Sequence, residues 1–219
     1  MNNVRKVMRL DAATWPLRIN FWWLIVLIDV GMLLFSLIKL WRVQTVLLPL
    51  TSGLTAGFMM MPFYSSRKSG IDGLMAIMPF QRREIVLGHF LYGLERILAL
   101  NLNLIAIDYV TTLFFQTNRS IMSVIWMDTA VTVFFILLLI VAYPLILGLD
   151  YPKTLMLVMG VMVGLEIISM YVIPVVGAEI LFLGGWLTVL GFGVLALTFV
   201  LALGCSIWLS IRLYETKDF

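Results

Sequence analysis

Long apolar stretches alternate with short polar connections along the whole chain. A helix needs about 20 apolar residues to cross the hydrocarbon core of a membrane. Six stretches reach that length, and each is expected to form one membrane-spanning helix: Ile19–Ile38, Val43–Phe63, a part of Ile85–Gln116, Ser123–Leu147, Thr154–Pro174 and Trp186–Leu209. The pattern predicts an all-α integral membrane protein with a single transmembrane domain over residues 1–219.

The composition excludes most other classes of protein. Hydrophobic residues make up 62% of the 219 residues and charged residues 12%, and the mean hydropathy is +1.06. A soluble domain of this size could not cover its surface with so few polar groups, since ordinary globular chains carry about 25% charged residues. A soluble enzyme, a disordered chain and a nucleic-acid-binding protein are therefore excluded.

The distribution of basic residues predicts how the spans are oriented. If the N-terminus is cytoplasmic, eleven of the 15 lysines and arginines fall in cytoplasmic segments and three fall in outer segments. Lysine and arginine are concentrated in the cytoplasmic loops of membrane proteins. This split therefore predicts that both the N-terminus and the C-terminus are cytoplasmic.

Residues 1–18 are expected to form an interfacial helix before the first span. Apolar positions recur at roughly helical spacing, and basic positions fall on other faces: Val4, Val7, Met8, Ala12 and Trp15 against Arg5, Lys6 and Arg9. Such a helix can lie on an anionic membrane surface. A basic tail without helical structure is the alternative.

The longest polar connection, residues 64–84, joins the second and third spans on the predicted cytoplasmic side. Ser69 and Asp72 have the spacing of a capping box at a helix start, and Pro79 cannot continue helical hydrogen bonding. The residues between them place their apolar side chains on one face: Ile71, Leu74 and Met78. The segment is therefore predicted to be a short amphipathic helix, which either rests on lipid headgroups or docks into a soluble partner.

Two short motifs and the overall layout carry a resemblance to a known family. The first motif, Met78-Pro79-Phe80-Gln81-Arg82-Arg83-Glu84-Ile85-Val86, has an apolar residue and proline, then basic residues, then an aliphatic pair entering the third span. The second, near the C-terminus, comprises Ser206, Ser210 and Tyr214-Glu215 before a charged tail. With six spans in 219 residues, the chain resembles an ABC-2 type exporter permease. His89 departs from the family pattern, because many relatives have lysine or arginine there.

By size, the nearest subgroup comprises bacterial permeases for amphipathic peptides, such as phenol-soluble modulin exporters and bacteriocin self-protection transporters. The resemblance implies that Ser69–Met78 is a coupling helix inserted into a separate ATPase subunit. The ATPase-coupling residues would then be Arg67, Lys68, Ser69, Ile71, Asp72, Leu74, Met78, Pro79, Arg82 and Arg83.

The resemblance also implies two permease chains, identical or paralogous, and two ATPase chains in the bacterial cytoplasmic membrane. A Walker A motif requires a lysine directly after a glycine. None of the five lysines of this chain follows a glycine. We therefore expect no cofactor in this chain, with ATP and Mg²⁺ bound by the partner ATPase.

Ionisable residues inside the predicted spans are further candidates for function. They are Asp29, Glu95, Arg96, Asp108 and Glu166. A carboxyl at mid-bilayer costs about 2.5–3.5 kcal/mol on insertion scales, so it needs a partner, a cavity or a proton. Asp29, Asp108 and Glu166 either hold helices together or line a transport path. Glu95 and Arg96 are expected at the inner interface, and a deeper Glu95 could pair with His89 or with a basic residue of the N-terminal helix.

Other features favour packing over chemistry. His89 is the only histidine, and without nearby cysteines or paired carboxylates it predicts a polar boundary residue and no metal site. Gly53-x-x-x-Gly57 and Gly160-x-x-x-Gly164 predict close approach between helices. Residues 174–185 are apolar and broken by proline and glycine, which predicts an outer re-entrant or interfacial helix, or else a tight apolar turn.

Taken together, these patterns predict the permease subunit of an ATP-driven exporter that moves a hydrophobic or amphipathic peptide, lipid or drug. The chain itself is not expected to be an enzyme and has no predicted catalytic residue. An intramembrane serine protease needs a serine with a base, and the chain offers only His89 near the inner boundary. The alternative is the substrate-binding subunit of an energy-coupling-factor importer, which is also a small six-span protein but lacks a basic coupling helix.

Overall fold

The computed structural model describes residues 2–13, 21–37, 53–60, 62–63, 80–114, 121–148, 156–157, 160, 164 and 185–216. Within these ranges the regular structure is helical throughout and contains no strand. The elements with defined bounds are α1 (Asn2–Ala13), α2 (Phe21–Leu37), α5 (Arg82–Phe114), α6 (Ile121–Gly148) and α8 (Gly185–Glu215). The prediction of an all-α protein is therefore confirmed for the part of the chain that is described.

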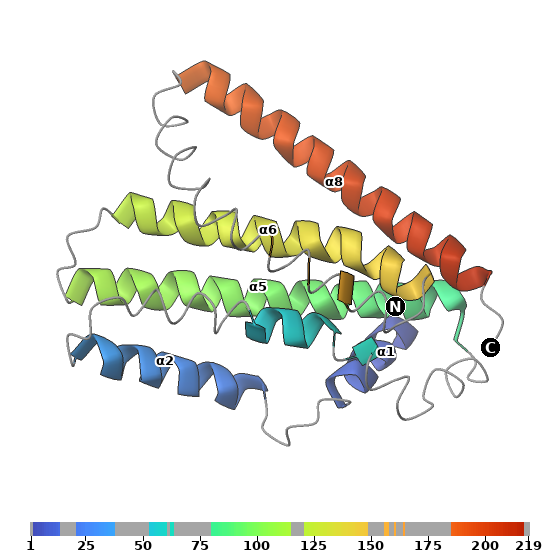
Figure 1. Ribbon diagram of the computed structural model, residues 1–219, viewed down its shortest axis with the longest axis horizontal. Helices are drawn as coiled ribbons and strands as arrows, with labels where there is room; N and C mark the ends of the chain where they lie inside the picture. The colour runs from blue at the N-terminus through green and yellow to red at the C-terminus, as the bar shows by residue number, and fades with distance from the viewer. Residues whose placement is uncertain are drawn as a thin grey trace.

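The long helices form a bundle around α5, which runs along the long axis of the molecule (Figure 1). Asn103 of α5 bonds Asp29 of α2, and Arg96 lies over Phe21 at the start of α2, so these two helices run in the same direction. Phe90 of α5 packs against Tyr143 of α6, which places α6 antiparallel to α5. These directions agree with the alternation expected of the first, third and fourth predicted spans.

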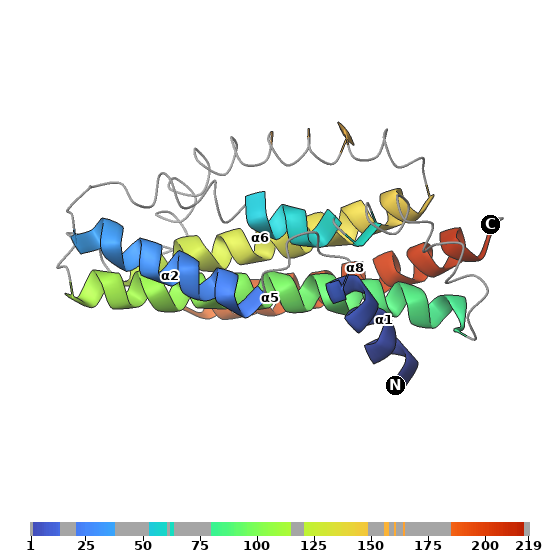
Figure 2. The same cartoon turned by 90° about the horizontal axis from the view of Figure 1, so that it is seen from below.

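The N-terminal helix, the start of α5 and the end of α8 lie at one end of this bundle (Figure 2). Toward its own start, α8 diverges from α6 (Figure 1). The helices α1 and α8 therefore each contact the first turn of α5, through Asn3 and Tyr214 respectively.

Two helices are long and apolar enough to cross a membrane, judged by length and composition over the described residues. They are α5 and the part of α8 over Leu197–Glu215, and shorter apolar helices cover Phe21–Leu34 and Val131–Leu147. With 33 residues at 1.5 Å per residue, α5 is about 50 Å long, whereas the hydrocarbon core is about 30 Å thick. The expectation that this helix protrudes from the membrane agrees with its length.

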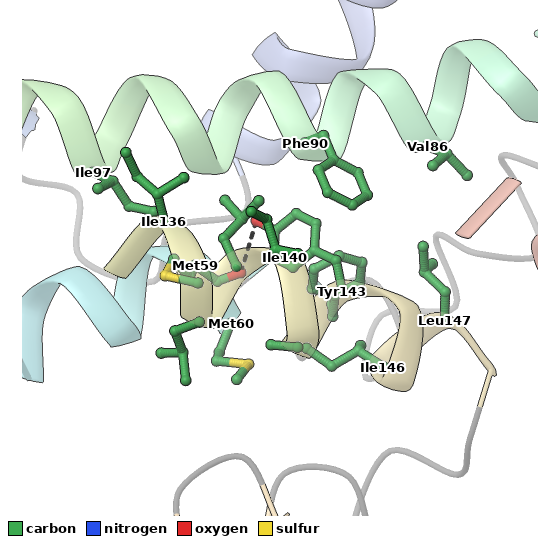
Figure 3. Close-up of a cluster of buried hydrophobic side chains, with 14 of the residues drawn as sticks. Met59, Met60, Val86, Phe90, Ile97, Ile136, Ile140, Tyr143, Ile146 and Leu147 are labelled. Atoms are coloured by element: carbon green, nitrogen blue, oxygen red, sulfur yellow. Dashed lines mark hydrogen bonds between the residues drawn. The ribbon is translucent and has the colours of Figure 1, made fainter. Parts of the chain in front are cut away.

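Tyr143 lies at the centre of the larger apolar core, which joins α5, α6 and residues 56–63 (Figure 3). The side chain is fully buried. Its ring packs edge-on against Phe90 and Phe63, with centroids 4.8 and 5.0 Å away. Its hydroxyl donates a hydrogen bond to the carbonyl of Met59 across 3.3 Å. This core therefore fixes the end of α6 against the first half of α5.

Gly88 and Gly93, which are not part of the two predicted motifs, are, among the described glycines, the sites where helices approach closely. A Cβ at Gly93 would overlap the Tyr143 hydroxyl and come 2.8 Å from Cδ1 of Leu139. A Cβ at Gly88 would come 2.6 Å from Cβ of Val7. The glycines of the predicted motifs, Gly53, Gly57, Gly160 and Gly164, would meet no described atom within 4 Å. Among the described residues, the close approach predicted for them is therefore not seen.

Candidate functional site

The candidate site is the end of α5 that follows the predicted coupling segment. Most of the predicted coupling residues lie outside the described part of the chain: Arg67, Lys68, Ser69, Ile71, Asp72, Leu74, Met78 and Pro79. Arg82 and Arg83 are described and occupy the first turn of α5. The expectation that these two arginines and Glu84 open a new element is confirmed.

Glu84 stabilises the start of α5 and ties it to α1. Its Oε2 accepts a hydrogen bond from the backbone N–H of Gln81 across 3.1 Å, the back-bond of a capping box. The amide Nδ2 of Asn3 donates to both carboxylate oxygens, at 3.2 and 3.1 Å. A negative charge in the first turn is also favourable for the helix dipole. One side chain thus fixes both the first turn of α5 and the N-terminal helix.

Arg82 and Arg83 contact a different helix, the C-terminal end of α8. The Nη1 of Arg82 donates to the carbonyl of Tyr214 at 3.3 Å and also to the carbonyl of Glu215. The Nε of Arg83 lies 3.4 Å from Oε1 of Glu215. The last carbonyls of a helix lack partners within the helix, and cations are favourable there. The arginines therefore act as a cap supplied by α5 to the end of α8.

His89 and Asp11 form a buried pair between α5 and α1. His89 Nδ1 lies 2.8 Å from Oδ2 of Asp11, and the two residues are 3% and 2% exposed. The ring of Phe63 lies 4.9 Å from the His89 ring. His89 is therefore a packed residue with a carboxylate partner. The partner is Asp11, whereas Glu95, for which a pairing with His89 was considered only at a deeper position, has a side chain that is about half exposed.

The N-terminal helix is described over Asn2–Ala13, and residues 14–18 of the predicted interfacial helix lie outside the described chain. It presents Val7 and Asp11 to α5, whereas Ala12 is exposed. The face of α1 that packs on α5 therefore includes a carboxylate that the predicted apolar stripe did not contain, and the placement of this helix on a membrane surface stays a prediction. The basic side chains Arg5, Lys6 and Arg9 are exposed, as expected.

Arg96 packs against aromatic rings at the level where α2 begins. Its guanidinium carbon lies 4.1 Å from the ring centre of Phe21 and 5.0 Å from that of Tyr92, geometry that gives a cation–π attraction. The side chain is only 12% exposed, and its Nη2 lies 4.0 Å from the neighbouring Glu95. From Arg96 back to Arg82, α5 continues for about 21 Å past the start of α2.

The acids of the predicted spans lie farther along α5, toward its other end. Asp29 accepts a hydrogen bond of 2.6 Å from Nδ2 of Asn103. Asp108 of α5 is buried, and Asp128 is on α6. Oδ2 of Asp128 is buried and has no hydrogen-bond partner among the described residues. Glu166 and residues 174–184 lie outside the described chain.

Asp128 was missed by the sequence reasoning, although the signal was present. It stands within the fourth predicted apolar stretch and should have been included with the other acids there. Among the described residues, no three His, Cys, Asp or Glu side chains come close enough to hold a metal ion. The described site therefore consists of helix contacts at one end of α5, with the Asp29–Asn103 hydrogen bond, Asp108 and Asp128 toward the other.

Comparison with known proteins identifies the family. No curated protein and no solved structure matches the chain. A family model described as "ABC-2 family transporter protein" matches residues 15–215. The match begins just after α1 and ends at the last residue of α8. The chain is matched over nearly its whole length, so it belongs to the ABC-2 family of transporter proteins and is an ABC transporter permease of the membrane.

Proposed function

We propose that this chain is the permease subunit of an ATP-driven exporter whose ATPase is a separate protein. Six spans with both termini in the cytoplasm, in a bacterial cytoplasmic membrane, form the pathway. The family match supports a transport role. The sequence supports a separate ATPase, because it has no lysine in a Walker A context.

The observation that carries this proposal is the contact made by the first turns of α5 with both ends of the chain. The proposed coupling segment, residues 64–84, ends in the first turn of α5, which begins at Arg82. Glu84 then bonds Asn3 of α1, and Arg82 bonds the end of α8. A force applied to the coupling segment would reach α5, α1 and α8 together, because charged or polar hydrogen bonds join all three.

Hydrolysis in the ATPase would therefore be transmitted as movement of the cytoplasmic end of α5. The α5 helix is about 50 Å long and packs against α6 through Tyr143. Its far half carries Asn103, which bonds Asp29 of α2, and the buried Asp108. Movement at one end would thus shift helices that hold the intramembrane acids.

The assembly we propose contains two permease chains, identical or paralogous, and two ATPases. The transported molecule is a hydrophobic or amphipathic peptide, lipid or drug, moved outward. No bond is made or broken by this chain. Family membership favours this reading over the energy-coupling-factor module, because the first motif and the basic segment belong to the ABC-2 pattern.

The test is to purify the tagged chain from its own membranes in mild detergent and to identify its partners by mass spectrometry. A co-purifying ATPase with a Walker A motif in equal amount supports the proposal. An ATPase together with a second, unrelated membrane subunit would favour the importer module. No ATPase in repeated mild preparations would contradict the proposal.

A pair of variants in the coupling segment sharpens this test. Leu74→Asp places a charge on the apolar face of the predicted coupling helix and should abolish ATPase binding while membrane insertion is unchanged. Ala76→Asp places the same charge on the opposite face of the predicted helix and should bind normally. Unchanged ATPase affinity in Leu74→Asp would show that this segment is not the coupling helix.

A further inference from the structure

The contact between α1 and α5 is built from three kinds of interaction on one face of α1. Asn3, Val7 and Asp11 are spaced four residues apart, so they lie along a single stripe of the helix. Asn3 donates to Glu84, Val7 packs where Gly88 lacks a side chain, and Asp11 meets His89. The stripe therefore follows the first two turns of α5.

Val7 determines how closely the two helices approach. The residue is fully buried. Its Cγ1 would lie 2.5 Å from any Cβ placed at Gly88. Only glycine at this position lets the backbones come so near, because real Cβ atoms are not found at that distance. Close packing brings the Asp11 carboxylate within hydrogen-bonding distance of the His89 ring.

The buried Asp11–His89 pair contributes little net stability to the contact between the two helices. Removing charged or polar groups from water costs free energy that a buried pair often only balances, and an apolar pair of the same size is commonly as stable. A buried pair does, however, specify one register, because sliding either helix would leave a buried polar group without its partner. The pair therefore favours one fixed position of α1 on α5.

We propose that Asp11 and His89 are positioning residues for coupling. They fix α1 on the first turns of α5, so that the N-terminal helix and the entry from the coupling segment move as one unit. This role rests on the proposed function, since it requires an ATPase that acts on the coupling segment. The exposed face of α1, with Arg5, Lys6 and Arg9, is left available to headgroups or solvent.

The test uses the complex of permease and ATPase as it co-purifies, reconstituted in lipid nanodiscs. Asp11→Asn keeps the size of the side chain and removes its charge. The matched control is Ala12→Asn, which introduces the same residue at the next, exposed position of α1. The exchange of both partners, Asp11→His with His89→Asp, tests whether the pair itself is required. For each complex the measurements are kcat and KM for ATP, the affinity for the ATPase, and hydrogen exchange of the α1 amides.

We expect Asp11→Asn to lower kcat about fivefold, within the range typical of substitutions that weaken coupling between sites. KM for ATP and the ATPase affinity should stay as in the wild type, because Asp11 is 2% exposed and buried against α5, out of reach of a partner surface. The α1 amides should exchange faster in this variant. Ala12→Asn should match the wild type, and the exchanged pair should recover most of kcat.

Three results would overturn the positioning role. One is a wild-type kcat in Asp11→Asn although its α1 amides exchange rapidly. Another is an equal fall of kcat in Asp11→Asn and Ala12→Asn. A third is lower thermal stability of Asp11→Asn with kcat per folded complex unchanged. A wild-type chain that binds no ATPase would instead overturn the proposed function, on which this role rests.

Discussion

The hydroxyl of Ser206 on α8 donates a hydrogen bond of 2.6 Å to the backbone carbonyl of Ile140 on α6. In an α-helix this carbonyl would normally accept from the N–H four residues later. That residue is Pro144, which lies inside α6 and has no N–H. Ser206 therefore supplies to α6 the hydrogen bond that Pro144 removes, and the bond also holds α8 in place.

Ser206→Ala should lower the free energy of unfolding by about 0.6–1.7 kcal/mol, the range for hydrogen bonds between membrane helices. The measurement is unfolding in mixed detergent micelles. In a Pro144→Ala background the loss should shrink, because the restored N–H at position 144 satisfies the Ile140 carbonyl. An equal cost of Ser206→Ala in both backgrounds would show that the two residues act independently.

Gly93→Ala should destabilise the protein by about 1–3 kcal/mol, the usual cost of overpacking a core. The added methyl group would overlap the Tyr143 hydroxyl and crowd Leu139. The matched control is Gly204→Ala, since a Cβ there meets no described atom within 4 Å. Adding Tyr143→Phe to Gly93→Ala should recover part of the loss. Thermal unfolding that ranks Gly204→Ala as the more harmful change would contradict this account.

The helices were predictable because membrane spans are set by local apolar length. The predicted fourth span, Ser123–Leu147, differs from α6 by only two residues at the start and one at the end. The last helix was underestimated: the apolar run stops at Leu209, but α8 continues to Glu215. Its last turns are buried at Ser210 and Tyr214, and Arg82 caps them. These are tertiary contacts, and the local hydropathy of the sequence cannot predict them.

The contacts of the candidate site were harder to predict for the same reason. Asp11 and His89 are 78 residues apart in the chain, and nothing in the local pattern joins them. Gly88 and Gly93 are five residues apart, so the small-xxx-small motif does not find them. By contrast, the role of Glu84 at the start of α5 follows from short-range capping rules, and the sequence identified it as part of that start.

Asn103→Leu should cost about 0.5–1.5 kcal/mol, because the partly buried Asp29 carboxylate loses its amide partner. The double variant Asp29→Leu with Asn103→Leu should be more stable than Asn103→Leu alone, since both polar groups are then absent. The reason is that removing one partner leaves a polar group without its hydrogen bond, whereas removing both partners leaves none. Unfolding in mixed micelles measures all three proteins. A double variant less stable than either single variant would indicate that Asp29 has another role.

The two arginines at the start of α5 should differ in their contribution to stability. Arg82 bonds two backbone carbonyls at the end of α8, and those carbonyls have no helical partners. Arg82→Ala should therefore cost about 1 kcal/mol and should speed hydrogen exchange in the last turn of α8. Arg83 is 69% exposed in its contact with Glu215. Arg83→Ala should cost at most about 0.5 kcal/mol, and high salt should remove even that difference. Equal effects of the two substitutions on exchange near Glu215 would show that simple charge, and not capping, holds the end of α8.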